Sequence, residues 1–194
     1  MSFRSAVLSY TVLVALTLCP RVGFAQGPAQ GLFKIRNVRQ QLVVAPDYRA
    51  VTTGAGNRSS SLSKKWLQIE TEFDSDPEWA DDVTLKYYVL VGKGREARLF
   101  GGEVTYINVQ KGQRHLSAMF MHPNTVERYG RGRVESVHVE VWYKGQRVDQ
   151  ETTPPTNVRW WEGAEAARGF LLDPQQTPWS VTAFDIYESP KPRQ

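Results

Sequence analysis

Alternation of apolar and polar residues is the feature that most constrains the fold of this chain. In residues 83–91, VTLKYYVLV, the alternate positions beginning with the first valine are apolar or aromatic. Residues 64–73 and 135–143 follow the same period of two, and 103–110 and 115–121 read as two further strands. Side chains alternate between the two faces of a strand, so this period indicates half-buried antiparallel strands.

Turn residues separate these segments at short intervals. YKGQ, residues 143–146, predicts a tight hairpin in which Gly145 takes a positive φ. VQKGQRH, residues 109–115, predicts a second turn, and residues 31–44 supply one long strand or two. Residues 179–188, WSVTAFDIYE, alternate once more. About eight strands with turn signals between them predict an all-β antiparallel sandwich.

Little helix is expected. DSDPEWADD, residues 74–82, is compatible with one helical turn, because a proline follows an aspartate that can cap it. PNTVERYG, residues 123–130, predicts another short helix, and EGAEAARGFLL, residues 162–172, predicts a third that ends at Gly169. Residues 189–194 read as a flexible tail.

The start of the chain has the pattern of a secretory signal peptide. Arg4 precedes an uncharged, largely apolar stretch, and VGFAQG follows it, so cleavage is expected before Gln26. The alternative is a membrane anchor, but the stretch is shorter than the roughly 20 apolar residues that span a bilayer. Residues 1–25 are therefore assigned to the signal peptide and residues 26–188 to one sandwich domain, with no membrane span in the mature chain.

Charge and cysteine content narrow the function. Removing Arg4 and Arg21 from the 24 basic residues leaves 22 against 20 acidic ones, a net charge of +2. A nearly balanced exported chain does not fit a nucleic-acid binder. The one cysteine, Cys19, lies in the signal peptide, so the mature chain relies on its core and not on disulfides.

Motifs for catalysis or metal binding are not apparent. The acidic run 72–82 lacks the glycine and the glutamate that the calcium loop of an EF-hand requires, so no metal or other cofactor is predicted. His115, His122 and His138 do not have the spacing of zinc ligands, and we expect them at the surface or half-buried. No Gly-x-Ser-x-Gly motif is present, and no carboxylate pair stands out. The chain is predicted not to be an enzyme.

Aromatic residues on the polar side of strands are the candidate interaction residues. Trp142 shares a face with His138 and Glu140, and Tyr88 likewise lies on the polar side of its strand. Such side chains suit sugar rings or a protein partner, and the alternative is that the segment 153–179 covers them. The candidate interaction residues are Trp142, Tyr88, Arg159 and Trp161.

The pair Trp160 and Trp161 follows two prolines and is expected to form a short extended segment. Neighbouring side chains on such a segment point in opposite directions. With Val158 taken as the inward residue, Trp160 is assigned to the core and Trp161 to the flanking face, beside Arg159. Truncation of Trp160 is therefore expected to cost more stability than truncation of Trp161.

The strand order and four segments resemble one known family. These segments are KKWLQIETEF (64–73), VTLKYYVLV (83–91), HVEVWYKGQ (138–146) and TPWSVTAFDIYE (177–188). They resemble the Amuc pilus-like family, small exported Ig-like proteins of Verrucomicrobiota that are encoded beside type IV pilus-like machinery. The similarity covers Leu32 to Glu188. It implies an Ig-like β-sandwich at the cell envelope, linked to pilus assembly or the outer membrane, and it carries over no catalytic residues.

One departure from pilins separates this chain from a filament subunit. A type IV prepilin is cut before its apolar run and keeps that run as the filament helix. Here the expected cleavage site follows the run, so the mature chain has no filament helix. An accessory or a secreted partner of such an apparatus fits better.

Three functions follow from these observations. The first is a non-catalytic exported envelope protein that acts through protein–protein contacts, with an envelope or pilus-associated protein as its partner. The second is a carbohydrate-binding module that uses outward aromatics on a surface glycan, and the third is a small secreted hydrolase. The expected location is the periplasm, the outer membrane or the cell exterior.

Overall fold

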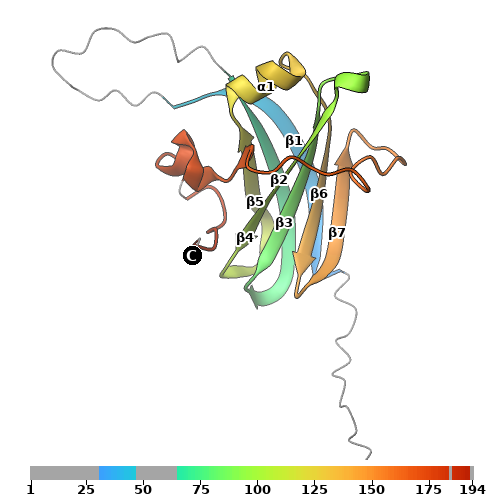
Figure 1. Ribbon diagram of the computed structural model, residues 1–194. Helices are drawn as coiled ribbons and strands as arrows, with labels where there is room; N and C mark the ends of the chain where they lie inside the picture. Colours follow the sequence, from blue (N-terminus) through green and yellow to red (C-terminus); the bar gives the residue numbers. More distant parts are fainter. Residues whose placement is uncertain (1–30, 47–64, 184, 193–194) are drawn as a thin grey trace, which may run out of the picture.

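Two antiparallel sheets pack face to face in the computed structural model, which describes residues 31–46, 65–183 and 185–192 (Figure 1). The predicted signal peptide and its cleavage site lie outside the described residues. The strands are β1 (Phe33–Val44), β2 (Lys65–Ala80), β3 (Val83–Val91), β4 (Arg98–Tyr106), β5 (Val109–Met121), β6 (Val134–Tyr143), β7 (Gln146–Thr153) and β8 (Leu171–Leu172). One α-helix, α1 (Pro123–Gly130), and the short 3₁₀ turns η2 (Gly94–Glu96), η3 (Pro174–Gln176) and η4 (Pro178–Ser180) complete the elements of the described ranges.

The strand order is that of an immunoglobulin-like sandwich. The first sheet has the order β1-β2-β5-β8, and the second has the order β4-β3-β6-β7. In such folds the first, second and fifth strands form one sheet, and the third, sixth and seventh form the other. The fourth strand here pairs with β3, at the edge of the second sheet. The prediction of an all-β, Ig-like antiparallel sandwich of about eight strands is confirmed.

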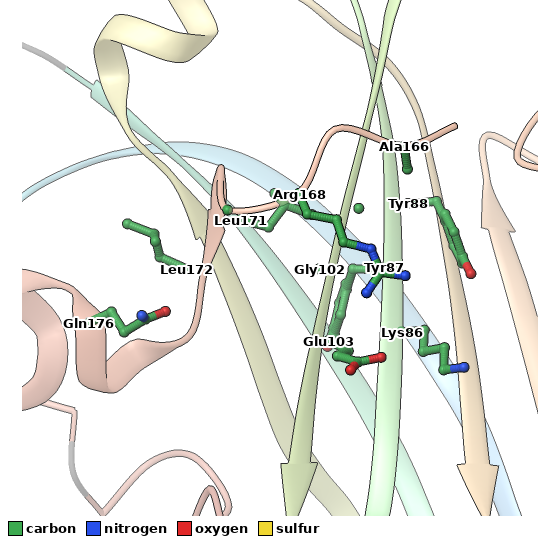
Figure 2. A pocket seen from close by; sticks show the side chains of 12 residues that line it. Lys86, Tyr87, Tyr88, Gly102, Glu103, Ala166, Arg168, Leu171, Leu172 and Gln176 are labelled. Carbon is green, nitrogen blue, oxygen red and sulfur yellow. The ribbon is translucent and has the colours of Figure 1, made fainter. Parts of the chain in front are cut away.

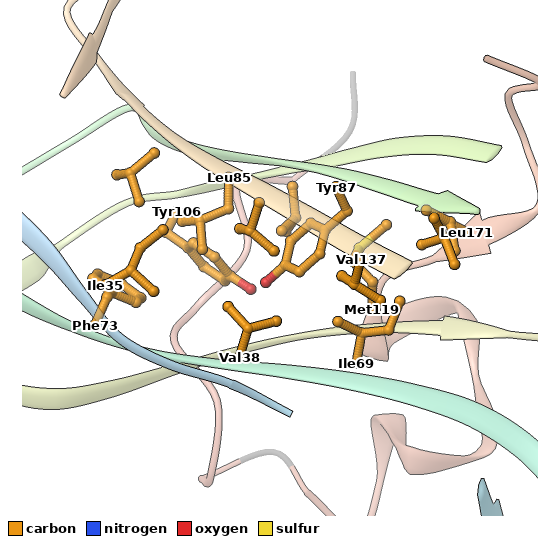
Figure 3. Close-up of a cluster of buried hydrophobic side chains, with 14 of the residues drawn as sticks. Ile35, Val38, Ile69, Phe73, Leu85, Tyr87, Tyr106, Met119, Val137 and Leu171 are labelled. Carbon is orange, nitrogen blue, oxygen red and sulfur yellow. The ribbon is translucent and has the colours of Figure 1, made fainter. Parts of the chain in front are cut away.

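The alternating residues form the core between the two sheets. In β3 every second side chain, from Val83 to Val91, is fully buried. Figure 3 shows Tyr87 and Tyr106 inside this core with their hydroxyl groups close together. Each hydroxyl forms a hydrogen bond with the Ser117 hydroxyl, at 2.7 Å for Tyr87 and 2.6 Å for Tyr106. Ser117 therefore removes the cost of burying two polar groups without a partner.

Several local predictions are confirmed. The hairpin between β6 and β7 turns at Lys144 and Gly145, whose φ angles are 50° and 76°. Two positive φ values in succession suit the right-handed twist of the strands that the turn joins. Residues 123–130 form α1 as expected, and β7 ends at Thr153, directly before the two prolines.

The predicted position of the turn between β4 and β5 is wrong. The turn between them lies at Ile107 and Asn108, and not at residues 109–115, so β5 runs without a break from Val109. Asn108 has a φ of 57°, a left-handed conformation that asparagine tolerates, and its N–H donates to Asp81. Gly112 lies inside β5, where the pairing with β2 shifts register.

The predicted helical turn at residues 74–82 is also absent. This acidic run continues β2 as far as Ala80, and Ser75, Trp79 and Ala80 pair with β5. Pro77 falls within a register shift between Ser75 and Trp79, a place where the missing N–H of proline breaks no ladder bond. The chain turns only at Asp81 and Asp82.

The C-terminal predictions of regular structure fail as well. Residues 162–172 form bends and β8 in place of a helix, with Gly163 and Gly169 at positive φ values of 79° and 82°. Residues 179–183 and 185–188 form the end of η4, turns and irregular backbone in place of a strand. Tertiary contacts, and not local periodicity, determine this part of the chain.

Candidate functional site

After β7 the chain forms a long strap, defined here as residues 154–183 and 185–192. It crosses the outer face of the second sheet, passes the edge of β4 and returns over the outer face of the first sheet (Figure 1). Ala167 bonds to Leu99 and Gly101 of β4, at 2.9 and 3.0 Å. Ser189 and Lys191, in the predicted tail, bond to Ile107 and Thr105, so this part of the tail is held against the sheet.

His138 and Trp161 form the contact that holds the strap on the second sheet. Their rings stack at a centroid distance of 3.5 Å and an angle of 11°. The ring of Tyr88, on the neighbouring strand, lies 6.0 Å from that of His138. His138 Nδ1 is 2.7 Å from the hydroxyl of Thr152 on β7. His138 has no exposed surface, so the expectation of a surface or half-buried histidine is wrong here.

Glu140 lies next to this stack and gathers three side chains. Its carboxylate accepts hydrogen bonds from Trp142 Nε1 and from the Arg147 guanidinium, each at 2.8 Å. His138 Nε2 is 3.6 Å from the same carboxylate. Only 4% of Glu140 is exposed, so its charge is compensated almost wholly by these neighbours.

The pKa of Glu140 reflects this environment. Burial of the carboxyl acts to raise the pKa, but contacts from His138, Arg147 and Trp142 outweigh it. The pKa of Glu140 is therefore lowered from 4.5 to about 2. Burial raises the pKa of Tyr88, with the negative charge of Glu140 as the next cause. Glu140 is thus ionised and Tyr88 neutral at neutral pH.

The structure brings three of the four predicted interaction residues to one face. Tyr88 and Trp142 are half-buried on the outer face of the second sheet, and Trp161 lies on top of it. The ammonium group of Lys86 lies over the Trp142 ring, 4.1 Å from its centroid. Arg159 is separate, because its side chain is 68% exposed and contacts Glu162 at 3.5 Å.

The predicted roles of the tryptophan pair need correction. Trp161 is on the flanking face as expected, but it is the buried member, with 9% exposed. Trp160 is half-buried beside it and not in the core, and Val158, taken as the inward residue, is 66% exposed. The segment is a turn and not a strand, so alternation does not apply.

Two adjacent glycines of β4 let the strap pass close to the sandwich. A Cβ on Gly101 would lie 2.9 Å from the Ala166 methyl group, on the outer face. A Cβ on Gly102 would lie 2.7 Å from Leu171 Cβ, on the inner face. Phe170 and Leu171 then pack against the core, where Phe170 meets the ring of Phe100 at 5.2 Å.

On the first sheet the strap covers a second group of aromatic residues. Trp179 stacks on Phe120 at 4.5 Å and meets the edge of Trp66 at 5.6 Å. Further along, the Tyr187 hydroxyl accepts a hydrogen bond from Gln68, and Glu188 contacts His115 at 2.6 Å. Much of the high aromatic content therefore serves to fasten the strap to both sheets.

The strap leaves a hollow of about 300 Å³ beside the middle of β4. Figure 2 shows Lys86, Tyr88, Glu103 and Arg168 around it. Neither Arg168 nor Glu103 makes an ion pair within 4.0 Å with any described residue. Sequence reasoning missed this hollow, because Arg168 reaches it only through the path of the strap.

The chemistry that these residues support is limited. General acid–base catalysis needs a group that can touch a substrate proton, and His138 is sealed beneath Trp161. In the described ranges no group of three His, Cys, Asp or Glu side chains is placed to hold a metal ion. None of the helices in those ranges is both long and apolar enough to cross a membrane. The cluster around Glu140 is best understood as an anchor for the strap.

The fold and this anchored strap define the class as an Ig-like β-sandwich that covers its own outer aromatics. The model of the Amuc pilus-like family matches residues 25–194, so the chain belongs to that family. The family is pilus-associated and is not a known family of enzymes.

A solved structure shares the fold. It is a crystal structure of a protein from Akkermansia muciniphila that is 24% identical, with a TM-score of 0.68. The alignment covers 84% of this chain and 94% of that one. No curated protein matches the chain significantly.

Proposed function

We propose that this chain is a non-catalytic, exported Ig-like protein of the cell envelope that acts through protein–protein contacts as an accessory of a type IV pilus-like apparatus. Membership of a pilus-associated family supports the setting. The observation that carries the non-catalytic role is the burial of its best candidate for acid–base chemistry: His138 has no exposed surface, and Glu140 is held ionised by three partners.

Export and location follow from the same proposal. Residues 1–25 act as a signal peptide, and the mature chain, beginning near Gln26, lies in the periplasm, at the outer membrane or outside the cell. The family match begins at residue 25, close to the expected cleavage site, which is consistent with this division.

The carbohydrate-binding alternative has less support. A sugar-binding face needs two or three exposed aromatic rings in a row. Trp161 is buried on His138, and Lys86 lies over the ring of Trp142. Tyr88 is itself only half-exposed, so these three residues do not form such a row.

The proposal is tested in cells that express a tagged full-length chain. We expect mass spectrometry to find the N-terminus at Gln26 or a near neighbour, and cross-linking to recover envelope or pilus-apparatus proteins. The matched control lacks residues 2–25, so it should stay in the cytoplasm and form no such cross-links. A chain that keeps residue 1 and stays in the cytoplasm, or that cross-links to no envelope protein, would contradict the proposal.

A further inference from the structure

The two sides of the sandwich differ in how their strand edges are covered. On one side β1 and β7 meet, with the Ile35 N–H bonded to the Asp149 carboxylate at 2.7 Å. On the other side lies the edge of β4, which the strap covers at two places. Ala167 bonds near the start of the strand, and Ser189 and Lys191 bond near its end.

Between these two places the edge of β4 is open at Glu103. The Gly101 N–H and the Thr105 carbonyl both bond to the strap, so both point away from β3. Peptide groups alternate along a strand, and Glu103 therefore presents its N–H and its carbonyl in that same direction. In the described part of the chain no backbone partner is recorded for either group, and Glu103 is exposed. An open edge of this kind is a template for another strand.

The charged side chain of Arg168 beside this gap indicates which kind of partner would bind there. Figure 2 shows the Arg168 guanidinium over the middle of β4, close to Glu103 and Tyr88. Lys86 and Glu103 lie opposite each other in the strand register, but the Lys86 ammonium lies over the Trp142 ring. Arg168 makes no ion pair within 4.0 Å with any described residue, so its guanidinium is available to a carboxylate of the occupant.

We propose that the open edge of β4 at Glu103 is a docking site for an extended, acidic peptide segment of a partner protein. The backbone of Glu103 supplies one donor and one acceptor for a short added strand, and Arg168 binds a carboxylate of that segment. This is the β-augmentation mode of peptide recognition, in which main-chain bonds supply affinity and flanking side chains supply specificity. The inference rests on the proposed function, since it names the surface through which the protein contact is made.

Proline at position 103 provides a sharp test. Glu103→Pro removes the outward N–H, and an edge strand tolerates proline where its N–H faces outward. The preceding residue, Gly102, has no Cβ to clash with the proline ring. Glu103→Ala is the matched control, because it removes the same side chain and keeps the N–H.

The probe is a library of heptapeptides displayed on phage and selected against the immobilised full chain. We expect acidic peptides that bind Glu103→Pro roughly fivefold or more weakly than Glu103→Ala, the effect of one lost hydrogen bond. Arg168→Glu should weaken the same peptides, and replacing their carboxylate by lysine should restore binding to that variant. Peptides that bind both position-103 variants equally, or no enriched peptide, would overturn the inference.

Amide hydrogen exchange supplies a readout that does not depend on whether the proline variant folds. In the free protein the Glu103 N–H should exchange much faster than those of Gly102 and Val104, which bond to β3. Binding of a selected peptide should slow exchange at Glu103. Protection of Glu103 in the free chain, or no change on binding, would refute the site.

Failure of this inference is distinct from failure of the proposed function. If Glu103→Pro leaves the cross-links to envelope proteins intact, the docking site is wrong and the envelope role stands. If the unmodified chain forms no such cross-links, the proposed function is wrong whatever the peptides do.

Discussion

Trp161 and His138 are the residues on which the path of the strap most depends. Trp161 is the only member of the tryptophan pair that stacks on the sheet, and it also seals His138 from solvent. Stacked aromatic pairs contribute about 0.5–1.5 kcal/mol beyond the area that they bury.

Trp161→Ala should therefore be the more damaging of the two tryptophan truncations. We expect it to lower the free energy of unfolding by about 3–5 kcal/mol, as for other large buried aromatics. Trp160→Ala, the control at a half-buried neighbour, should cost clearly less. Urea unfolding of both variants measures the difference, and an equal or inverted order would show that the stack does not anchor the strap.

Glu140 provides a second prediction, on pH dependence. Its folded pKa of about 2 lies below its usual 4.5, so its contribution is fully present above pH 4.5 and is lost as the pH falls toward 2. The difference between these values corresponds to about 3 kcal/mol. Glu140→Gln should lower stability by an amount of this order at pH 7 and by much less near pH 2.

The measurement compares urea unfolding of the wild-type chain and Glu140→Gln at pH 7, 4.5 and 2.5. Taking the difference between the two proteins removes the titration of all other carboxylates. A difference that stays constant with pH would show that the network around Glu140 does not depend on its charge.

At the scale of elements, the two consecutive glycines of β4 are explained by the strap that crosses this strand. Its consecutive glycines face opposite sides, so Ala166 packs on one and Leu171 on the other. If either glycine carried a side chain, the strap could not pass from the outer face into the gap between the sheets. Glycine normally weakens a strand, and here it marks a close approach of another backbone.

A third prediction follows for Gly101. Gly101→Ala places a methyl group against that of Ala166 and should destabilise the protein by about 1–3 kcal/mol, as overpacking does. Ala166→Gly in the same chain should recover much of this loss. The four proteins of this double-mutant cycle are compared by urea unfolding, and simple additivity of the two changes would contradict the proposed contact.

At the scale of the whole molecule, the strap acts as the cover of both sheets. It shields His138 on one face and Phe120 and Trp66 on the other, and Phe170 and Leu171 complete the core at the β4 edge. A sandwich without it would expose the rings of Phe120 and Trp66 on the first sheet and the apolar core beside β4. Patches of that kind are unusual on monomeric proteins.

The fourth prediction is that a chain ending at Thr153 does not fold as an independent sandwich. We expect it to aggregate or to lose cooperative thermal unfolding, because both outer faces and part of the core are uncovered. A chain ending at Glu188 is the control, since it loses only the bonds of Ser189 and Lys191 and should keep a cooperative transition. Calorimetry of both truncations decides the matter, and a sharp transition in the shorter chain would refute the role of the strap.

The sequence by itself determined the sandwich. The period of two in β3 and β6 required that Tyr87 and Val139 face inward while Tyr88 and His138 face outward, whatever the rest of the chain does. It also determined the hairpin at Gly145, because that turn needs a positive φ. These are local properties of the backbone and of side-chain alternation.

Only the tertiary structure decided how the outward residues are used. Residues 154–178 lack a regular period, and the alternation of residues 179–188 forms no strand in the described part of that range, so nothing local indicates that Trp161 reaches His138 or that Ala167 and Lys191 cover the two ends of β4. The same holds for Arg168 and Glu103, which are far apart in sequence and lie near each other only because the strap crosses β4. Strand patterns are short-range, whereas the cover of a face and the gap at an edge arise from contacts between distant segments.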